Sequence, residues 1–384
     1  MQRHSRRAVG SIDSGQHPVH FWPTPATLPA MLELLDQMAD LSALREREAL
    51  NQALLNTIRQ RLPFVSAHLC HLVGDLDNAR WRIVAHHHHK DEAHTNAVHR
   101  SGTDPEWTAL DALPAMAEHP QRVAAMRTQQ VQRWHPPGAR HTHAAFPLTY
   151  ASGDHAVLEV ETSSNLDDDT LQIMHSVLRL YRNIGNLLDY GERDSLTELL
   201  NRKTFDSAFL RATIAQQLAT TLAAPDERRQ TQEGGSYWLA VLDIDHFKRV
   251  NDKHGHLIGD EVLLLVARLM RRQFRHHDQL YRFGGEEFVV LMRCHGEAEA
   301  AEVLERMRAG MAEYRFPQAG QITVSIGFAE VRTGDSPSGA FERADKAVYH
   351  AKGNGRNQVC SHNALVNQGI LTDSAGAVGD MELF

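Results

Sequence analysis

The sequence has little cysteine, no long apolar run and no excess of positive charge. Its three cysteines, Cys70, Cys294 and Cys360, are too few and too scattered for a disulfide framework or a zinc site, so we interpret them as buried or idle thiols in a reducing compartment. No segment approaches the roughly 20 apolar residues that cross a bilayer, and the basic N-terminus lacks the apolar core of a secretory signal. A net charge of −8 argues against a general nucleic-acid binder, which needs a basic face. We therefore expect a cytoplasmic protein with no nucleic-acid partner and no membrane partner.

The length of 384 residues is enough for two ordinary domains, because single cores rarely grow beyond about 250 residues. A composition that is 42% hydrophobic and 23% charged is typical of a globular protein. Breaks in periodicity divide the chain into a flexible arm, a first domain, a connecting helix, a second domain and a disordered tail: residues 1–28, 29–166, 167–193, 194–360 and 361–384.

Histidine is the residue in excess. The chain has 25 histidines, 17 of them before residue 190, and His86 to His89 are consecutive. Metal binding stays open, because short His-rich tracts can ligate metals. On a strand, however, successive side chains point to opposite faces, so at most two of these four could share one site. We favour a solvated strand end and loop.

The first domain mixes helical and strand patterns. Its expected elements are a helix, two strands, a second helix and a hairpin, at residues 28–62, 64–73, 81–85, 112–131 and 144–161. The strand with Phe146-Pro147-Leu148, a short polar turn and the strand Val157–Glu161 resemble the end of a GAF-type sensor domain. The resemblance implies a GAF-like α/β sensor over residues 29–166, whose ligand the sequence does not specify.

The connecting helix carries Met174, Val177, Tyr181, Ile184 and Leu188 at spacings of three and four. This pattern predicts a seam that can pair with a copy of itself in a short parallel coiled coil. A single amphipathic helix that packs on its own domain gives the same pattern, because two heptads are short for a coiled coil. The pattern alone leaves both interpretations open.

The second domain interleaves helices and strands. Its expected helices lie at residues 202–222, 257–273, 297–313 and 338–352, and its strands at 237–244, 279–293 (a pair) and 322–329. Such an order predicts an α/β (or α+β) fold, with a central mixed sheet flanked by helices. The polar segment Ala223–Ser236 is expected to be a surface loop.

Three groups of polar residues in this domain suggest chemistry. The apolar strand Trp238–Leu242 delivers Asp243 to its carboxyl end, where open α/β sheets bind ligands. Gly284-Gly285 lies between apolar strands, which is the composition of a tight hairpin turn, and two glutamates follow it. Lys352 and Arg356 flank a third, glycine-containing turn. Carboxylates can hold Mg²⁺ and the two cations can neutralise a triphosphate, so the groups together predict phosphoryl transfer.

The segment Gly284-Gly285-Glu286-Glu287-Phe288 matches the motif that names the GGDEF family of diguanylate cyclases. Companion segments over Asp194–Asn357 are similar to that family in residue type and spacing. The resemblance implies a homodimer that joins two GTP molecules into cyclic di-GMP with loss of two pyrophosphates, with Mg²⁺ or Mn²⁺ as the cofactor. Glu198 stands where the family usually has glycine, which leaves the conformation of that turn open.

The resemblance also implies roles for individual residues. Asp243, the Ile244 backbone carbonyl and Glu286 would be metal ligands; Glu286 would also be the general base for the 3′-hydroxyl, and Glu287 would support placement of metal or nucleotide. Asn251 and Asp260 offer the donor and acceptor that a guanine edge requires. The positions that the family uses for GTP are Phe247, Lys248, Asn251, His256, Asp260, Gly284, Gly285, Lys352 and Arg356.

Arg275 and Asp278 are three residues apart, with five residues between Asp278 and Gly284. This offset matches the product-inhibition site of the same family, which binds cyclic di-GMP. Arginine can grip a phosphate or a guanine with two hydrogen bonds. An ordinary surface ion pair is the alternative, and we favour the inhibitory site.

These observations predict a diguanylate cyclase controlled by its N-terminal domain and by its product. One domain offers one GTP site, yet the product is two-fold symmetric, so two domains must face each other across a two-fold axis. Two alternatives remain: a non-catalytic module that only senses nucleotides, and a nucleotidyltransferase that makes a mixed or linear dinucleotide. The presence of Asp243, Glu286 and Glu287 favours catalysis over the first.

Overall fold

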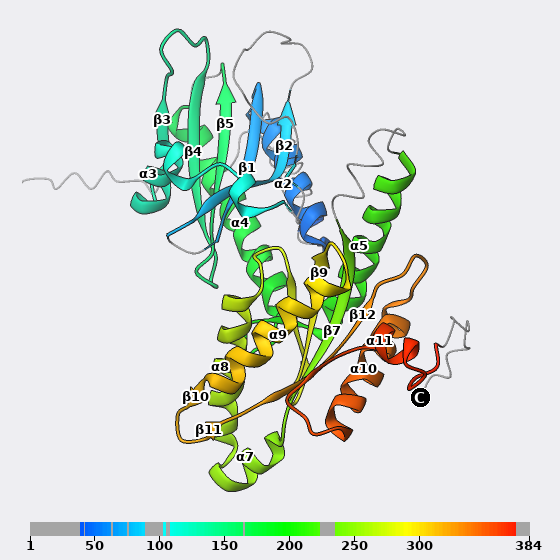
Figure 1. Cartoon of the computed structure of the whole chain (residues 1–384). Coiled ribbons are helices and arrows are strands. Elements are labelled where there is room, and N and C mark those ends of the chain that lie inside the picture. The colour runs from blue at the N-terminus through cyan, green and yellow to red at the C-terminus, as the bar shows by residue number, and fades with distance from the viewer. Residues whose placement is uncertain are drawn as a thin grey trace, which may run out of the picture. The chain divides into compact units, whose positions relative to one another are not determined.

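The computed structural model describes residues 39–41, 43–62, 64–74, 77–88, 103–104, 108–163, 166–222 and 235–373 (Figure 1). It separates into two units, Met1–Leu44 and Arg45–Phe384. Every helix and strand named below belongs to the second unit. The arm expected at residues 1–28 lies outside the described residues, as do His89 and most of the loop expected at 223–236.

The first half of the second unit contains a five-stranded antiparallel sheet in the order β2-β1-β5-β4-β3 (Figure 1). Its strands are β1 Ser66–Val73, β2 Arg80–His88, β3 Gln132–Trp134, β4 Thr142–Thr149 and β5 His155–Thr162. The helices are α2 Arg47–Arg61, α3 Pro120–Thr128 and α4 Asp168–Glu192. The strands and the hairpin predicted from the sequence are confirmed.

Helices pack on both faces of this sheet. Cys70 and Val157 point to the face that α3 covers, where they join one buried apolar cluster with Ala125. Ala145 of β4 belongs to the same cluster. Because side chains alternate along a strand, the next residue, Phe146, points to the other face. There it meets His175 of α4 with ring centroids 6.3 Å apart.

The helix α4 is 25 residues long and begins where the Asp167 carboxylate accepts a hydrogen bond from the Thr170 backbone N–H. The Tyr181 hydroxyl donates to Asn51 Oδ1 of α2 at 2.6 Å. The buried residues of α4 include four of the five that were predicted to form a self-pairing seam: Met174, Val177, Tyr181 and Ile184. That seam is therefore used within the chain, which favours the second of the two interpretations, an amphipathic helix that packs on its own domain. Over two heptads, a coiled-coil repeat of 3.5 and an amphipathic repeat of 3.6 residues cannot be told apart.

The second half contains a six-stranded mixed sheet in the order β13-β12-β7-β9-β8-β6. Pairing is antiparallel except for β12 with β13 and β6 with β8. The strands are β6 Leu200–Asn201, β7 Ser236–Ile244, β8 Gln279–Gly284, β9 Glu287–Cys294, β12 Val324–Glu330 and β13 Val359–Ser361, beside a small pair, β10 Arg315–Phe316 and β11 Gly320–Gln321. The helices are α5 Arg202–Leu222, α7 Phe247–His254, α8 His256–Gln273, α9 Glu297–Glu313, α10 Pro337–Gly353 and α11 His362–Asn367. The predicted mixed sheet flanked by helices is confirmed.

Alternation along β7 separates two apolar layers. Leu242 belongs to the layer shared with α8 and α9, and Val241 to the layer shared with α5 and α10. The helix α10 lies unusually close to β12, because a Cβ on Gly327 would stand 2.3 Å from the backbone carbonyl oxygen of Ala344 and 2.3 Å from the backbone nitrogen of Val348. Glycine at this position therefore sets the distance between the sheet and α10.

Three expectations about local structure need correction. The helix predicted at residues 112–131 is shorter: two 3₁₀ turns, Leu110–Ala112 and Met116–Glu118, precede α3, which starts at Pro120, a residue suited to a first helical turn. The helix α7 was not predicted. Residues 361–373 of the expected tail are folded, since the Ser361 hydroxyl caps α11 and Leu365 is buried. A helix of six residues is too short to show a periodicity.

None of the described helices has the length and apolarity that crossing a membrane would require.

Candidate active site

The hairpin between β8 and β9 turns at two glycines. Gly284 pairs with Glu287, so Gly285 and Glu286 form the tip. Gly284 and Gly285 have φ angles of +140° and +53°, a region that residues with a Cβ rarely adopt. Arg282 supports the tip by donating from Nε and Nη2 to the Gly285 carbonyl at 3.2 and 2.9 Å. The predicted tight turn is confirmed, and it places both glutamates where β9 begins, at one end of the sheet.

Asp243 lies beside this turn, near the end of β7. It pairs across the strands with Glu287 of β9, and the next backbone N–H, from Ile244, donates to the Glu286 carbonyl at 3.3 Å. The ammonium of Lys352, from α10, stands 2.7 Å from Asp243 Oδ2. Three separate parts of the sequence thus bring three carboxylates and one cation together.

Burial raises the pKa of all three carboxyl groups above their usual values. For Asp243 the hydrogen bond and charge of Lys352 oppose that effect. The negative charge of Asp243 raises the pKa of Glu286 further, and the charges of Asp345 and Asp243 do the same for Glu287. Carboxylates that share a site repel one another, and a cation relieves the repulsion. The site therefore favours bound positive charge.

The donors fit a hard divalent cation that also binds phosphate. Among the described residues no group of three or more histidine, cysteine, aspartate or glutamate side chains is arranged to hold a metal ion. Mg²⁺ commonly takes only one or two carboxylates and completes its shell with water and substrate phosphates. Asp243 and Glu286 can supply the carboxylate oxygens. The contact between Asp243 and Lys352 shows that this carboxylate accepts a cation in its present orientation.

A basic turn follows α10. Lys352 is half-buried at its start, and Arg356 is exposed near its end. Arg356 has a φ angle of +62° and its N–H donates to the Ala351 carbonyl at 3.0 Å, so the backbone of the turn is folded back on the helix. The turn carries two cations, of which Lys352 contacts Asp243.

The segment predicted to recognise guanine spans α7 and the start of α8. Phe247 is buried and Lys248 is exposed. Asn251 lies over Gly259, where an added Cβ would stand only 1.9 Å from Asn251 Oδ1. His256 and Asp260 are exposed at the start of α8. Asn251 therefore packs directly against Gly259, and this contact requires that position 259 has no side chain.

Glu198 stands where the GGDEF family usually has glycine, and the structure shows the conformation of this turn. It adopts a φ angle of +58°, the left-handed conformation that glycine suits best. The turn is held by Asp194, whose carboxylate accepts from the N–H and the hydroxyl of Thr197 at 2.8 and 2.7 Å and from Arg282 at 3.0 Å. Burial raises the pKa of Asp194, but these hydrogen bonds outweigh it and bring the pKa below its usual value. The turn forms without glycine and connects the start of the domain to the hairpin.

Arg275 and Asp278 do not form the surface ion pair that was the alternative interpretation. The Arg275 guanidinium donates to Glu299 Oε1 at 2.7 Å. Asp278 is buried, and its carboxylate accepts the backbone N–H of Arg275 at 2.8 Å. Burial raises the pKa of Asp278 to about 6. The inhibitory site stays a prediction, and its arginine is engaged by a glutamate that the sequence analysis did not consider.

Sequence reasoning missed three residues at the candidate active site. Arg282 supports the hairpin tip, and Asp345 adds negative charge near Glu287. Asp245, two residues after Asp243, is a buried carboxylate with hydrogen bonds to β12 and to the basic turn. The sequence held a signal for Asp245 alone: a second aspartate at the end of an otherwise apolar strand.

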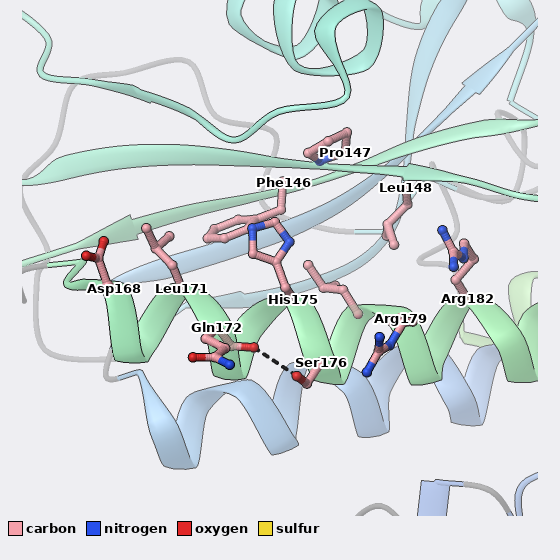
Figure 2. Close-up of a pocket in the computed structure, with 11 residues that line it drawn as sticks. Phe146, Pro147, Leu148, Asp168, Leu171, Gln172, His175, Ser176, Arg179 and Arg182 are labelled. Carbon is pink, nitrogen blue, oxygen red and sulfur yellow. Dashed lines mark hydrogen bonds between the residues drawn. The ribbon is translucent and has the colours of Figure 1, made fainter. Parts of the chain in front are cut away.

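A cavity of about 570 Å³ lies in the first domain between β4 and the N-terminal half of α4 (Figure 2). Phe146 and Leu148 line its sheet side, and His175, Arg179 and Arg182 line its helix side (Figure 2). None of its lining residues belongs to the candidate active site.

Comparison with known proteins identifies the family of the second domain. Residues 192–358 match the family described as "Diguanylate cyclase, GGDEF domain". Diguanylate cyclase DgcP of Pseudomonas aeruginosa (strain PAO1) is 42% identical over 169 residues, which are 43% of this chain and 23% of that protein. Diguanylate cyclase DgcM of Escherichia coli (strain K12) is 33% identical over 189 residues, 49% of this chain and 43% of that protein. The second domain is therefore a GGDEF domain of the diguanylate cyclase family.

A crystal structure of the coiled coil and GGDEF domain of DgcB from Caulobacter crescentus, in complex with c-di-GMP, is 32% identical and covers 52% of this chain and 100% of that chain, with a TM-score of 0.43. The present chain spans less than half the length of the two curated relatives, 23% and 43%.

Proposed function

We propose that this chain is a diguanylate cyclase, which joins two GTP molecules into cyclic di-GMP and releases two pyrophosphates. The observation that carries the proposal is the convergence of Asp243, Glu286 and Glu287 around one end of the sheet, with Lys352 at 2.7 Å from Asp243. Because GTP is a cytoplasmic nucleotide, we place the reaction in the cytoplasm.

In the proposed reaction the 3′-oxygen of one GTP attacks the α-phosphorus of the other, the bond to pyrophosphate breaks, and Glu286 takes the proton. A glutamate carboxylate can act as such a base when it lies within hydrogen-bond reach of the proton that it takes. Lys352 and Arg356 offset the charge of the triphosphate, and the Asp243 and Glu286 carboxylates with the Ile244 carbonyl would hold Mg²⁺ or Mn²⁺. Such a cation neutralises the phosphate oxygens and orients the leaving group. Positioning and charge account for most catalysis of phosphoryl transfer.

Purified protein incubated with Mg²⁺ and GTP, with ATP, or with both tests this proposal when the products are identified by mass. Cyclic di-GMP from GTP alone is the expected product. A mixed or linear dinucleotide would assign the chain to a different nucleotidyltransferase. Binding of GTP without any product would assign it to a non-catalytic sensing module.

Gly259→Ala is expected to raise the KM for GTP at least about tenfold, because the new methyl group displaces Asn251 from the guanine edge and leaves polar groups unpaired. The rate at saturating GTP should change much less. Steady-state kinetics measure both. Gly310→Ala is the matched control, since its added Cβ would meet only the flexible end of Gln273. An unchanged KM in Gly259→Ala would remove Asn251 from the proposed guanine site.

The proposal includes a homodimer, and the outer face of α4 supports it. Ile173, Leu180 and Leu187 are seven residues apart, and Tyr190 follows at a spacing of three. Ile173, Leu187 and Tyr190 are 37%, 71% and 84% exposed although they are large and apolar. A second apolar stripe thus lies beside the buried one, at the spacing that suits pairing with another helix.

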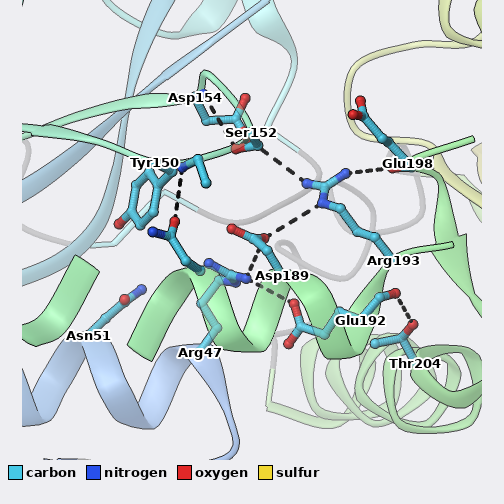
Figure 3. Close-up of polar contacts among 12 residues, drawn as sticks. Arg47, Asn51, Tyr150, Ser152, Asp154, Asp189, Glu192, Arg193, Glu198 and Thr204 are labelled. Carbon is cyan, nitrogen blue, oxygen red and sulfur yellow. Dashed lines mark hydrogen bonds and ion pairs between the residues drawn. The ribbon is translucent and has the colours of Figure 1, made fainter. Parts of the chain in front are cut away.

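Control by the first domain is also part of the proposal, and polar contacts at the end of α4 support it (Figure 3). Arg47 of α2 donates to Asp189 at 2.8 Å and to Glu192 at 2.9 Å. Arg193, the residue after α4, lies 3.6 Å from Asp189 and donates to the Glu198 carbonyl at 2.9 Å. A movement of α2 relative to α4 would therefore reach the turn that leads into the GGDEF domain.

The path continues through covalent neighbours. Asp194 follows Arg193 directly and pairs with Arg282, which in turn holds the Gly285 carbonyl. A change of α4 at its C-terminal end can thus bias the glycine hairpin through contiguous contacts. Coupling of this kind requires two packings of α4 of which a signal favours one.

Arg47→Ala is expected to lower the basal cyclase rate of the full chain at least about fivefold, because the last turn of α4 loses the cation that ties it to α2. The KM for GTP should stay the same. Arg127→Ala, at an exposed arginine of α3, serves as the control. Wild-type rates in Arg47→Ala would show that this cluster plays no part in control.

Product inhibition at Arg275 and Asp278 completes the proposal. Arg275→Ala is expected to weaken inhibition by cyclic di-GMP at least about tenfold, because a charged donor to the product is lost. Glu299→Gln should have the opposite effect, since it weakens the contact that now engages Arg275 at 2.7 Å. Initial rates at several product concentrations measure both, with Arg272→Ala as the control. Unchanged inhibition in Arg275→Ala would exclude the site.

A further inference from the structure

Asp245 is a buried carboxylate next to the active site, and the proposed reaction gives it no role. It follows β7, two residues after Asp243, and only 5% of it is exposed. Its carboxylate accepts three hydrogen bonds: from Thr323 Oγ1 at 2.6 Å, from Ser325 Oγ at 2.7 Å and from the Asn357 backbone N–H at 3.0 Å. Its own N–H donates to the Thr323 carbonyl at 2.9 Å. A carboxylate with so many donors is fixed in one orientation.

The bond to Asn357 reaches the basic turn. Arg356 and Asn357 have φ angles of +62° and +44°, so two successive non-glycine residues are in the left-handed region. Backbone of this kind persists only where surrounding contacts impose it. The Arg356 N–H is held by the Ala351 carbonyl at 3.0 Å, and Asn357 Oδ1 accepts from Arg308 Nη1 at 2.8 Å. Among these contacts the bond from the Asn357 N–H is the one that ties the turn to the end of β7.

The same turn meets β7 a second time, at its other end. Lys352, which opens the turn, stands 2.7 Å from Asp243. The segment from Lys352 to Asn357 is therefore pinned to β7 at both ends, by Asp243 and by Asp245. Two attachment points fix the position and also the orientation of the loop between them, and this loop carries Arg356.

We propose that Asp245 is a positioning residue for the triphosphate: it holds the turn that carries Lys352 and Arg356 in register with the metal-binding end of β7. This inference rests on the proposed function, in which GTP is the ligand of that turn. Asp245 itself does not touch the nucleotide. Its contribution should appear in the affinity for the phosphates and be absent from the affinity for the guanosine part.

The test compares the binding of two probes to the full chain by calorimetry in the presence of Mg²⁺: GTP with a methylene group between its α- and β-phosphates, and guanosine. Asp245→Ser keeps a small polar group that is too short to reach Asn357. It is expected to weaken binding of the triphosphate probe at least about tenfold and to change guanosine binding less than about twofold. Asp245→Asn should restore triphosphate binding, because its amide oxygen can accept from Asn357 and Thr323 while its NH₂ donates to Ser325. Ser325→Ala, which removes a partner of Asp245 that lies outside the turn, is the control.

The results separate this inference from the proposed function. If the wild-type chain binds the triphosphate probe and Asp245→Ser binds it equally well, Asp245 has no positioning role and the proposed function stands. If the wild-type chain does not bind the triphosphate probe, both fail. Hydrogen exchange in the wild-type chain gives a reading that needs no variant. The Asn357 amide should exchange slowly, and exchange as fast as that of a solvent-exposed amide would also overturn the proposal.

Discussion

Asp243→Asn and Glu286→Gln are each expected to lower the rate of cyclic di-GMP formation by at least about 100-fold, because each removes a charged oxygen that stabilises the reacting phosphates through a bound cation. Both substitutions keep the size and shape of the side chain. Burial raises the pKa of both groups, which means that the folded state disfavours their negative charges. Removing these charges should therefore not destabilise the fold. The melting temperature should therefore stay the same or rise, while the rate falls.

Two exposed carboxylates provide matched controls. Asp206→Asn on α5 and Glu302→Gln on α9 also replace a carboxylate by its amide, but away from the hairpin. Initial rates with GTP and Mg²⁺, together with circular dichroism, complete the comparison. Unimpaired synthesis in the double variant of Asp243 and Glu286 would refute the proposed chemistry, whatever the folding data show.

The fold of the second domain could be predicted because its signals are local. The strand Ser236–Ile244 is a nearly uninterrupted apolar run, and two adjacent glycines can hardly be anything but a turn between β8 and β9. Such patterns depend on a few neighbouring residues, so they can be recognised without knowledge of the tertiary packing. Asp243, Glu286 and Lys352 come from three distant segments, so their chemistry predicts a shared site, while their individual roles were predicted only through the family resemblance.

The parts that could not be predicted depend on packing between segments. The role of Asp245 follows from its contacts with Thr323, Ser325 and Asn357, which are about 80 to 112 residues away in sequence. The engagement of Arg275 by Glu299 is of the same kind. The helix α7 is eight residues long, and Phe247 and Val250 are its two apolar residues, so the segment is too short for the apolar pattern to repeat.

The helix α4 shows the same limit. Its residues Met174, Val177 and Tyr181 have the spacing of a self-pairing seam, yet α2 and the sheet occupy that face. The neighbouring stripe, with Leu187 and Tyr190, is the one left exposed. Which of two stripes faces outward is decided by the rest of the domain and cannot be read from the helix alone.

The exposed stripe of α4 predicts where the proposed dimer should break. The double substitution Leu187→Glu and Tyr190→Glu is expected to raise the dissociation constant of the dimer more than about 100-fold, because each carboxylate would have to be buried against an apolar partner at a cost of about 2 kcal/mol or more. Since cyclic di-GMP needs two GTP sites, the specific activity should fall at least as steeply at low protein concentration. Analytical ultracentrifugation and initial rates over a range of concentrations measure the two effects.

A fused dimeric coiled coil distinguishes loss of the dimer from damage to the domain. If α4 only brings two GGDEF domains together, an N-terminal fusion should restore much of the activity of the double variant, because the local concentration of the two sites rises to the millimolar range. Leu210→Glu, at a partly exposed leucine of α5, should leave both the dimer and the rate unchanged. A double variant that remains dimeric and active would show that the two GTP sites meet through a different surface.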